Sequence, residues 1–259
     1  MKRNLFLFLG LGTLAILVGF DLFTKWQAPK QDTNQDVLGE PAPEYKEVTE
    51  ITFKNKTYKV AWYQVVDTDA LTLLPNFDQE LSAQSVLENQ NCTFVVSGGF
   101  YTPENKPTGL FIAEGKTLKE FSANNLLNGV FSLNYFGTPR ITRSRPQDEL
   151  RLAVQTGPIL IENTFVQKAS LTSDKEARRV VVATTGANEV YFLIFWDPNS
   201  FFNGPYLADL SQLVKEVEEK TGVAFADAVN LDGGAASAFM DGIKLSEAKK
   251  VGSFFCVKD

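Results

Sequence analysis

The sequence predicts an α+β fold in which a mixed β-sheet core with several hairpins packs against at least two helices. Short runs rich in β-branched and aromatic residues recur along the chain between turn-forming residues, which is typical of strands and hairpins. The hydrophobic period changes to a helical one at residues 79–90 and 207–222. Hydrophobic residues make up 44% of the 259 residues, enough for a substantial core.

The N-terminal part is expected to lie outside the folded domain. Residues 1–23 join two basic residues to a long apolar run, which predicts an export signal or an uncleaved signal anchor that tethers the protein to a membrane. Residues 24–49 are polar and aperiodic and are expected to form a flexible linker. Residues 50–259 would then form one exported domain, in the periplasm or at the cell surface.

The first half of this domain contains signals for strands, one short helix and two hairpins. The predicted elements are a strand at 58–66, a helix at 79–90, a strand at 92–97 that ends in glycines, a hairpin at 109–121 turning at Glu114–Gly115, and a hairpin at 130–143 turning at Gly137.

The second half adds hairpins around one longer helix. The predicted elements are two runs within 151–163 broken at Gly157–Pro158, a hairpin at 178–196, a helix at 207–222, a strand at 224–231, a hairpin at 237–245 turning at Asp241–Gly242, and a strand at 253–259. The helix is predicted because Leu207, Leu210, Leu213, Val214 and Val217 recur at helical spacing before Gly222, a common C-terminal stop.

Composition excludes several classes of function. The chain has no histidine, which excludes Ser-His-Asp triads, Cys-His dyads and histidine-ligated zinc. A net charge of −6 argues against a nucleic-acid partner. Catalysis would therefore depend on carboxylates, Arg, Lys, Tyr, Ser or backbone dipoles.

Two cysteines, Cys92 and Cys256, lie in strand-like runs. An exported domain could oxidise them to a disulfide, but cysteine is also often buried as a free thiol. The sequence leaves both states open.

The segment "VNLDGG", Val229 to Gly234, carries the main candidate for chemistry. A strand leaving a sheet would deliver Asp232 to the sheet's end, where ligands tend to bind. Gly233 and Gly234 could offer backbone N–H groups as a nest for a phosphate oxygen, with Asp232 beside it as acid, base or nucleophile. The alternative is an ordinary Asp-Gly turn.

Two further segments could contribute to the same site. Gly98 and Gly99 end a strand and are followed by Phe100 and Tyr101, which could stack on a sugar ring; the alternative is a bulge that needs small residues. Arg178 and Arg179 open a strand, so one of them should face the site, where Arg suits phosphate or carboxylate. The alternative is that the arginines lie on the surface and aid solubility. This alternative fits Arg178 alone better than it fits both arginines.

Five segments in order resemble the motifs of the phosphodiester glycosidase family. They are "SGGFY" at 97–101, "KPTGL" at 106–110, "QTGPIL" at 155–160, "RVVVA" at 179–183 and "NLDGGAA" at 230–236. Five motifs in the same order are far more specific than "LDGG" alone.

This resemblance implies a compact α+β domain that cleaves a sugar from a sugar-1-phosphodiester, with a glycan phosphodiester as the partner. Asp232 would be the catalytic carboxylate and Arg179 the cation on the phosphate side. The residues implied in substrate or phosphate binding are Ser97, Gly98, Gly99, Tyr101, Gly109, Asn230, Gly233 and Gly234.

The second carboxylate of a glycosidase pair and the metal requirement stay open. Glu104, Glu162 and Asp197 are the candidates for the second carboxylate. No cofactor is assigned with certainty, although Asp232 and nearby carbonyls could hold a divalent cation.

Departures from the family pattern suggest a second hypothesis. Ser97 stands where the family usually has Asn, and Ala235 and Ala236 stand where it has Gly and Ser. Ala235 also adds a Cβ in a turn where a positive φ could be required. The alternative is a non-catalytic envelope module that keeps the fold and binds a glycan or a partner protein.

Overall fold

The computed structural model describes residues 46–169, 171 and 173–258. The predicted export signal and most of the predicted linker therefore lie outside the described residues. Within the described part, no helix combines the length and the apolar character needed to cross a membrane.

The described part is predominantly β and contains three sheets with two α-helices, α1 (Ala83–Asn89) and α2 (Leu210–Thr221). Every strand pair in these sheets is antiparallel, so the prediction of a mixed sheet is wrong. The reason is that hairpins supply many of the connections, and a tight turn reverses the direction of the chain.

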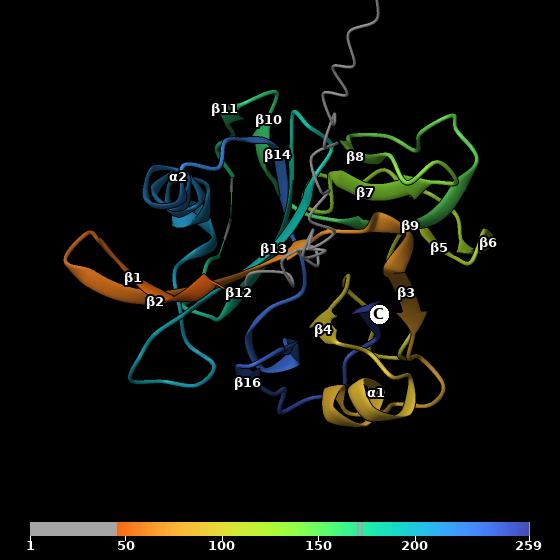
Figure 1. Ribbon diagram of the computed structural model, residues 1–259, viewed down its shortest axis with the longest axis horizontal. Coiled ribbons are helices and arrows are strands. Elements are labelled where there is room, and N and C mark those ends of the chain that lie inside the picture. Colours follow the sequence, from red (N-terminus) through yellow and green to blue (C-terminus); the bar gives the residue numbers. More distant parts are fainter. Residues whose placement is uncertain (1–45, 170, 172, 259) are drawn as a thin grey trace, which may run out of the picture. The chain divides into compact units, whose positions relative to one another are not determined.

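The largest sheet has seven strands and carries the predicted hairpin at 178–196 in its centre (Figure 1). Its strands, in spatial order, are β1 (Lys46–Phe53), β2 (Lys56–Val65), β13 (Val190–Trp196), β12 (Arg179–Thr185), β14 (Phe225–Asn230), β10 (Ile159–Glu162) and β11 (Phe165–Val166).

Strand β1 corrects the predicted boundary between linker and domain. It begins at Lys46, four residues inside the segment predicted as a flexible linker. Lys54 and Asn55 connect it to β2 with φ values of 49° and 63°, the positive φ pair of a type I′ hairpin turn. Pairing with β2 thus orders residues that look like a polar linker when read alone.

The two other sheets have five strands each. The second sheet consists, in spatial order, of β16 (Lys244–Leu245), β15 (Phe239–Met240), β4 (Phe94–Ser97), β17 (Ser253–Val257) and β3 (Leu71–Pro75). The third consists of β6 (Lys116–Lys119), β5 (Phe111–Ala113), β9 (Leu150–Thr156), β7 (Gly129–Asn134) and β8 (Pro139–Thr142). The predicted hairpins are confirmed, whereas β3 was not predicted.

The three sheets share one central core. One face of the seven-stranded sheet contributes side chains such as Phe192, the second sheet contributes Phe94 and Phe255, and the third contributes Phe131. The rings of Phe131, Phe192 and Phe255 contact one another. Burying such large apolar side chains is the main favourable contribution to folding.

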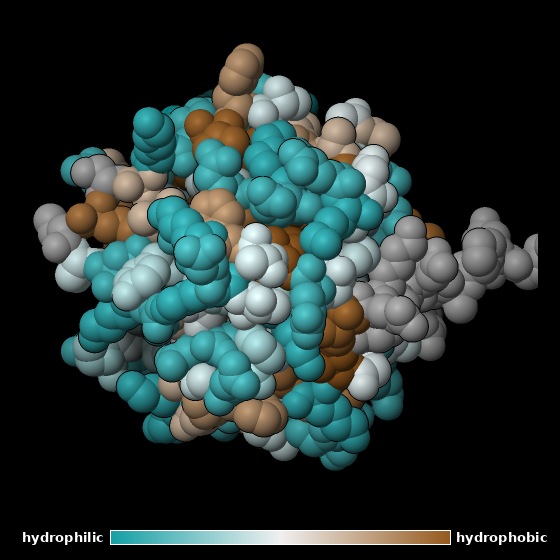
Figure 2. Space-filling model, turned by 90° about the vertical axis from the view of Figure 1, so that its left-hand side faces the viewer, coloured by the Kyte–Doolittle hydropathy of each residue, from teal (hydrophilic) through white to brown (hydrophobic). Residues whose placement is uncertain are grey.

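Helix α2 covers the opposite face of the seven-stranded sheet (Figure 1). The residues predicted to form its apolar face are buried, and Gly222 ends the helix with a φ of 73°, a left-handed conformation that favours glycine. Helix α1 packs on the second sheet and begins after Ser82, whose Oγ accepts the N–H of Ser85 at 3.1 Å. The face near α2 and the β1–β2 hairpin is mostly hydrophilic, with hydrophobic residues only in narrow strips (Figure 2).

A disulfide joins Cys92 to Cys256 across 164 residues. It connects the approach to β4 with the neighbouring strand β17, and both cysteines are buried. The structure thus resolves the choice that the sequence left open in favour of a bond.

Candidate active site

The ends of strands from all three sheets meet where β14 leaves the seven-stranded sheet. The Asp232 N–H donates to the Gly98 carbonyl at 3.0 Å, just beyond the end of β4. The Gly157 N–H, just beyond β9, donates to the Asn230 carbonyl at 3.1 Å. The predicted glycine bend at 98–99 and the "LDGG" segment therefore lie side by side.

Strand register places Arg179 opposite Asp232. Strands β12 and β14 are antiparallel, with Val181 paired to Asn230, so a step of two residues along each strand brings Arg179 across from Asp232. Each of these two charges shifts the pKa of the other group. The two residues predicted to carry the chemistry thus share one edge and one face of the sheet.

The Asp232 carboxyl is held in a partly protonated state near neutral pH. Burial raises its pKa to about 7, and the Gly233 N–H, 2.8 Å from Oδ1, and the charge of Arg179 offset only part of this effect. The residue nevertheless keeps partial solvent exposure. A largely buried carboxyl with such a pKa at a strand end is suited to proton transfer at physiological pH.

Tyr101 lies close enough to Asp232 to feel its charge. Burial raises the pKa of the Tyr101 phenol, and the negative charge of Asp232 raises it further. The phenol donates a hydrogen bond to the Lys250 carbonyl. This position agrees with the expectation that an aromatic residue after the glycine bend borders the site.

The guanidinium of Arg179 is fixed on one side and unpartnered on the other. Its Nε donates to the Pro205 carbonyl at 3.1 Å, and its Nη2 donates to the Lys175 carbonyl at 2.6 Å and to Asp174 Oδ1 at 3.2 Å. Nη1 makes no hydrogen bond to a described residue. One nitrogen rather than a bidentate fork therefore remains for a ligand.

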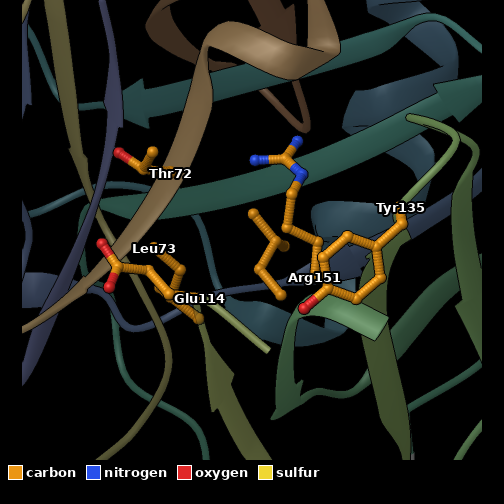
Figure 3. A pocket seen from close by; sticks show the side chains of 6 residues that line it. Thr72, Leu73, Glu114, Tyr135 and Arg151 are labelled. Atoms are coloured by element: carbon orange, nitrogen blue, oxygen red, sulfur yellow. The ribbon is translucent and has the colours of Figure 1, made fainter. Parts of the chain in front are cut away.

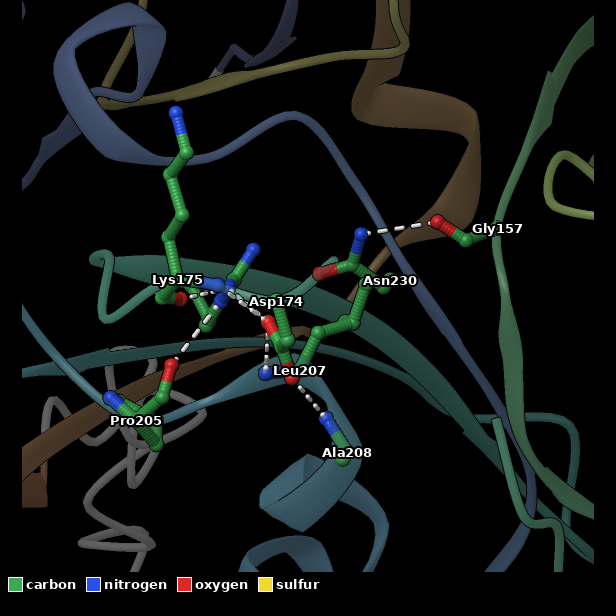
Figure 4. A network of polar contacts seen from close by, with 8 residues as sticks. Gly157, Asp174, Lys175, Pro205, Leu207, Ala208 and Asn230 are labelled. Atoms are coloured by element: carbon green, nitrogen blue, oxygen red, sulfur yellow. Dashed lines mark hydrogen bonds and ion pairs between the residues drawn. The ribbon is translucent and has the colours of Figure 1, made fainter. Parts of the chain in front are cut away.

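Asp174 is a residue that the sequence reading missed. Besides Arg179, it accepts the N–H groups of Leu207 at 3.1 Å and Ala208 at 2.9 Å at the start of the segment that leads into α2 (Figure 4). It thus fixes Arg179 relative to this segment. In the sequence, Asp174 is an acidic residue within a polar loop, and such a residue cannot be told from an ordinary surface position.

The predicted phosphate nest at the double glycine is not open. The Gly233 N–H is bonded to Asp232 Oδ1, and the Gly234 N–H donates to the Arg178 carbonyl at 2.7 Å. Glycine is needed at 233 because a Cβ there would lie 2.5 Å from the Arg178 carbonyl oxygen. The two glycines therefore allow a close approach of two backbones and leave no free N–H groups for an anion.

The turn tolerates the alanine at 235. The left-handed conformation falls on Gly234, with a φ of 61°, and Ala235 is not among the residues with positive φ. The strain considered for Ala235 is therefore absent, and this departure from the family pattern does not distort the turn.

The other predicted binding residues divide into two groups. Ser97 and Asn230 lie at the junction and are buried. Ser97 Oγ donates to the Asp232 carbonyl at 3.4 Å, and Asn230 Nδ2 donates to the Gly157 carbonyl at 2.9 Å (Figure 4). Asn230 Oδ1 is buried with no partner among the described residues.

Gly99 and Gly109 pack against β9 and its side chains. A Cβ on Gly99 would lie 2.4 Å from Val154 Cγ2, and one on Gly109 would lie 2.3 Å from Gln155 Oε1. The Gln155 amide is bonded to the backbone of the loop around Ser122 and Leu127. Gly109 therefore serves loop packing against Gln155.

Arg178 is a buried structural cation, which corrects the expectation of a surface position. Its Nε donates to Ser237 Oγ at 2.7 Å, its Nη2 to the Ser246 carbonyl at 2.8 Å and its Nη1 to the Phe201 carbonyl at 3.1 Å. The Phe202 ring lies 5.1 Å from its Cζ. Burial lowers the pKa of Arg178 to about 10, so it stays positive at neutral pH.

We expect Arg178→Met to destabilise the protein by about 3 kcal/mol, because the Ser237 hydroxyl and the carbonyls of Phe201 and Ser246 would lose a charged donor in the interior. The change is measured as the free energy of unfolding in urea. Arg140→Met is the matched control: this arginine is exposed and its ion pair with Asp148 is 3.5 Å long, so its loss should cost under about 0.5 kcal/mol. Equal stabilities of the two variants would contradict the role assigned to Arg178.

The three candidates for a second carboxylate make bonds elsewhere. Glu162 forms two 2.7 Å hydrogen bonds with Arg143, and Asp197 Oδ1 accepts the Asn199 N–H at 2.7 Å. Glu104 lies in an exposed loop, where a hydrogen bond from Thr102 lowers its pKa. No carboxylate contributes to the pKa of Asp232, so none of the three pairs with it in the described structure.

A cavity of about 410 Å³ adjoins the junction on the side of β10. Its lining includes Pro158, whose carbonyl accepts the Asn230 N–H at 3.1 Å, together with Asn128 and Lys168. The cavity thus begins one strand away from the segment that carries Asp232. Among the described residues, no three His, Cys, Asp or Glu side chains lie together as a metal cluster.

Comparison with known proteins gives one family match and several structural matches. A family model described as phosphodiester glycosidase matches residues 90–258. No curated protein sequence matches the chain.

Among solved structures, the fold is similar to the catalytic domain of zebrafish N-acetylglucosamine-1-phosphodiester α-N-acetylglucosaminidase, auto-inhibited by its pro-peptide. The TM-score is 0.67 at 14% identity, covering 86% of this chain and 85% of that chain. A hypothetical protein from Synechocystis has a TM-score of 0.62 at 11% identity, over 84% of this chain and 64% of that chain. A putative exported protein from Burkholderia pseudomallei has a TM-score of 0.53 at 11% identity, over 79% and 75%. At these identities the structural matches show the fold alone.

Proposed function

The chain belongs to the phosphodiester glycosidase family, and from this premise we propose that it is a hydrolase that releases a sugar from a glycosyl-1-phosphodiester in the cell envelope. The observation that carries the proposal is that Arg179 lies near enough to Asp232, whose pKa is about 7, for each charge to act on the other at the junction of the sheets. The junction thus supplies a proton-transfer group and a cation.

The reaction would proceed by attack of water on the sugar C1 through an oxocarbenium-like transition state. The water oxygen forms the new bond to C1, the C1–O bond breaks, and its electron pair leaves with the phosphate. Asp232, as the carboxylate, would orient the water and accept its proton. The phosphate is already a good leaving group, so it needs stabilisation of its charge more than protonation.

The developing charge on the phosphate would be stabilised by Arg179. Its Nη1 has no partner among the described residues, and its other two nitrogens are held by Pro205, Lys175 and Asp174. A cation fixed in advance stabilises charge without reorganising during the reaction. Asn230 is buried, and its Oδ1 has no partner in the described part of the chain, so Asn230 would position the strand end or accept a hydrogen bond from the substrate.

A non-catalytic envelope module that binds a glycan or a partner protein is the second candidate. It is favoured by the bonded N–H groups of Gly233 and Gly234 and by the short Ser97 side chain, whose hydroxyl is turned to the Asp232 carbonyl. Such a module would bind a sugar phosphate without turning it over.

We also propose that the domain works outside the cytoplasm, tethered through residues 1–23. The disulfide between Cys92 and Cys256 supports this, because disulfides persist mainly in oxidising compartments. The apolar N-terminal run supports it as a signal or anchor.

The test of the main proposal is a hydrolysis screen of the full chain. A panel of glycosyl-1-phosphodiesters that differ in sugar and aglycone is incubated with the protein, with and without a chelator, and the released reducing sugar is measured. Release from at least one compound supports the hydrolase. Binding of a sugar phosphate without release over long incubation would replace it with the binding module.

We expect kcat/KM to rise with pH and to level off above an inflection near pH 7. The reason is that a general base must be ionised, and burial raises the Asp232 pKa to about 7. The measurement is the pH–rate profile on any compound turned over in the screen. A rate that falls above pH 7 would assign Asp232 the role of a general acid instead.

A further inference from the structure

We propose that a second sugar-binding site lies around Tyr135, remote from Asp232, and holds a neutral part of a glycan. The choice of a sugar as ligand rests on the proposed function. The location of the site rests on two hollows that share one aromatic ring.

The first hollow is a pocket of about 250 Å³ between β3, β9 and two hairpin turns. It is lined by Thr72, Leu73, Glu114, Tyr135, Arg151 and Leu152. Figure 3 shows Tyr135 and Glu114 on opposite sides of the pocket, with Leu73 beside Glu114 and Arg151 between Glu114 and Tyr135. An apolar wall with a few polar groups at its rim is typical of small-ligand sites.

The second hollow adjoins the same ring. It has a volume of about 500 Å³, and its lining includes Tyr135, Arg145, Asp148 and Glu149. Tyr135 thus separates a mainly apolar pocket from a charged one. A pyranose has apolar C–H faces and a polar edge, so it can stack on a tyrosine ring while its hydroxyls reach polar neighbours.

The Tyr135 ring is exposed and meets a hairpin turn at its hydroxyl end. The residue is 55% exposed, and its hydroxyl lies so close to Gly115 that a Cβ there would be 2.0 Å from the oxygen. Gly115 has a φ of 75° and donates its N–H to the Arg151 carbonyl at 2.8 Å. The aromatic face is thus accessible to a ligand, while the hydroxyl end lies against a turn that is bonded to β9.

The polar groups at the pocket favour an uncharged ligand. Glu114 has no hydrogen bond or ion pair to a described residue, and Arg151 is held by the carbonyls of Leu71 at 2.7 Å and Thr68 at 2.5 Å. One carboxylate, from Glu114, and one guanidinium, from Arg151, thus line the first hollow. The second is lined by two carboxylates, Asp148 and Glu149, and one guanidinium, Arg145, so its net charge is negative and disfavours a phosphate. Sugar hydroxyls can both donate to carboxylates and accept from a guanidinium.

Strand β9 sets the separation between this site and the catalytic candidates. Arg151 lies near its start, and Thr156, whose Oγ1 donates to the Asn230 carbonyl at 2.6 Å, lies at its end. The strand rises about 3.4 Å per residue, so the five steps from Arg151 to Thr156 span roughly 17 Å. A single ligand would therefore need several sugar units to reach both sites at once.

The experiment follows the Tyr135 ring by NMR in full-length protein with labelled tyrosine, carrying Asp232→Asn so that no probe is consumed. The probes are the methyl glycosides of glucose, galactose, mannose and N-acetylglucosamine at millimolar concentration. We expect at least one of them to shift the Tyr135 ring signals. Tyr135→Ala should weaken the binding of that probe about tenfold, as for the loss of one stacked ring. Tyr135→Phe should bind the same probe as the unchanged chain does.

Phe136→Ala is the matched control, because Phe136 is the neighbouring aromatic residue, is 93% exposed and lines neither hollow. The Phe136→Ala variant should bind the probe as tightly as the unchanged chain does. The proposal is overturned if no probe moves the Tyr135 signals, or if Tyr135→Phe binds as weakly as Tyr135→Ala. Either result leaves the hydrolysis screen unaffected, so failure of this site and failure of the proposed function can be told apart.

Discussion

Replacing Asp232 with Asn should reduce sugar release from a glycosyl-1-phosphodiester by about 10²- to 10⁴-fold, the usual contribution of a positioned general base. The amide keeps the size of the side chain but cannot accept the proton of the attacking water. Its Oδ1 can still accept the Gly233 N–H, so the turn is retained. The measurement is kcat/KM on a compound identified by the hydrolysis screen.

Asp227→Asn is the matched control, because Asp227 lies on the same strand, β14, and bonds the Asn163 N–H at 2.9 Å away from the candidate site. Turnover by this variant should stay within about twofold of the unchanged chain, as for a surface substitution away from the chemistry. Unchanged turnover in Asp232→Asn would remove this residue from the mechanism.

The same substitution should raise stability at high pH. The folded pKa of Asp232, about 7, lies above the ordinary value of 3.8, so folding favours the protonated carboxyl. This contribution is complete below about pH 4, and the stability falls as pH rises from there to about 7. Asn does not ionise, so the variant should exceed the unchanged chain by up to roughly 4 kcal/mol above pH 7 and match it at pH 4. Urea unfolding at both pH values measures the difference.

Removing the disulfide should cost about 5 kcal/mol of unfolding free energy. The bond between Cys92 and Cys256 closes a loop across 164 residues, and loops of this length give the largest entropic effect on the unfolded chain. The double variant Cys92→Ser, Cys256→Ser should therefore melt well below the oxidised chain. Thermal unfolding followed by circular dichroism is the measurement.

Treatment of the unchanged chain with a reductant provides the control, since it removes the bond without changing side-chain volume. The reduced chain and the double variant should have similar melting temperatures. If both melted at the temperature of the oxidised chain, the disulfide would contribute nothing, and its support for export would be lost.

Local patterns predicted most of the secondary structure. The helical spacing before Gly222 and the turn residues at Glu114–Gly115 and Asp241–Gly242 mark elements that the structure contains. Strand β1 was missed because it continues a polar, proline-containing segment without a break, and its pairing with β2 shows where the strand begins. The hairpins implied antiparallel neighbours, but the direction of pairing between strands that no hairpin joins, such as β12 with β14, leaves no mark on a local pattern.

At the candidate site, the residue types were recognisable but their bonds were not. The strand positions of Asp232 and Arg179 were sufficient to place both at a sheet end. The occupied N–H groups of Gly233 and Gly234, the buried location of Arg178 and the anchoring role of Asp174 all depend on partners far away in the chain. A sequence read alone carries no information on which distant carbonyl or carboxylate a given donor meets.

Residue types and short-range order were enough to recognise the family, to locate most strands and both helices, and to select Asp232 and Arg179 as candidates. The packing of the sheets was needed to show which arginine is structural, that the cysteines are bonded, and that burial raises the pKa of Asp232 to about 7. The physical reason is that burial and long-range hydrogen bonding arise when separate strands are packed together, and these set the charge state and partners of each group.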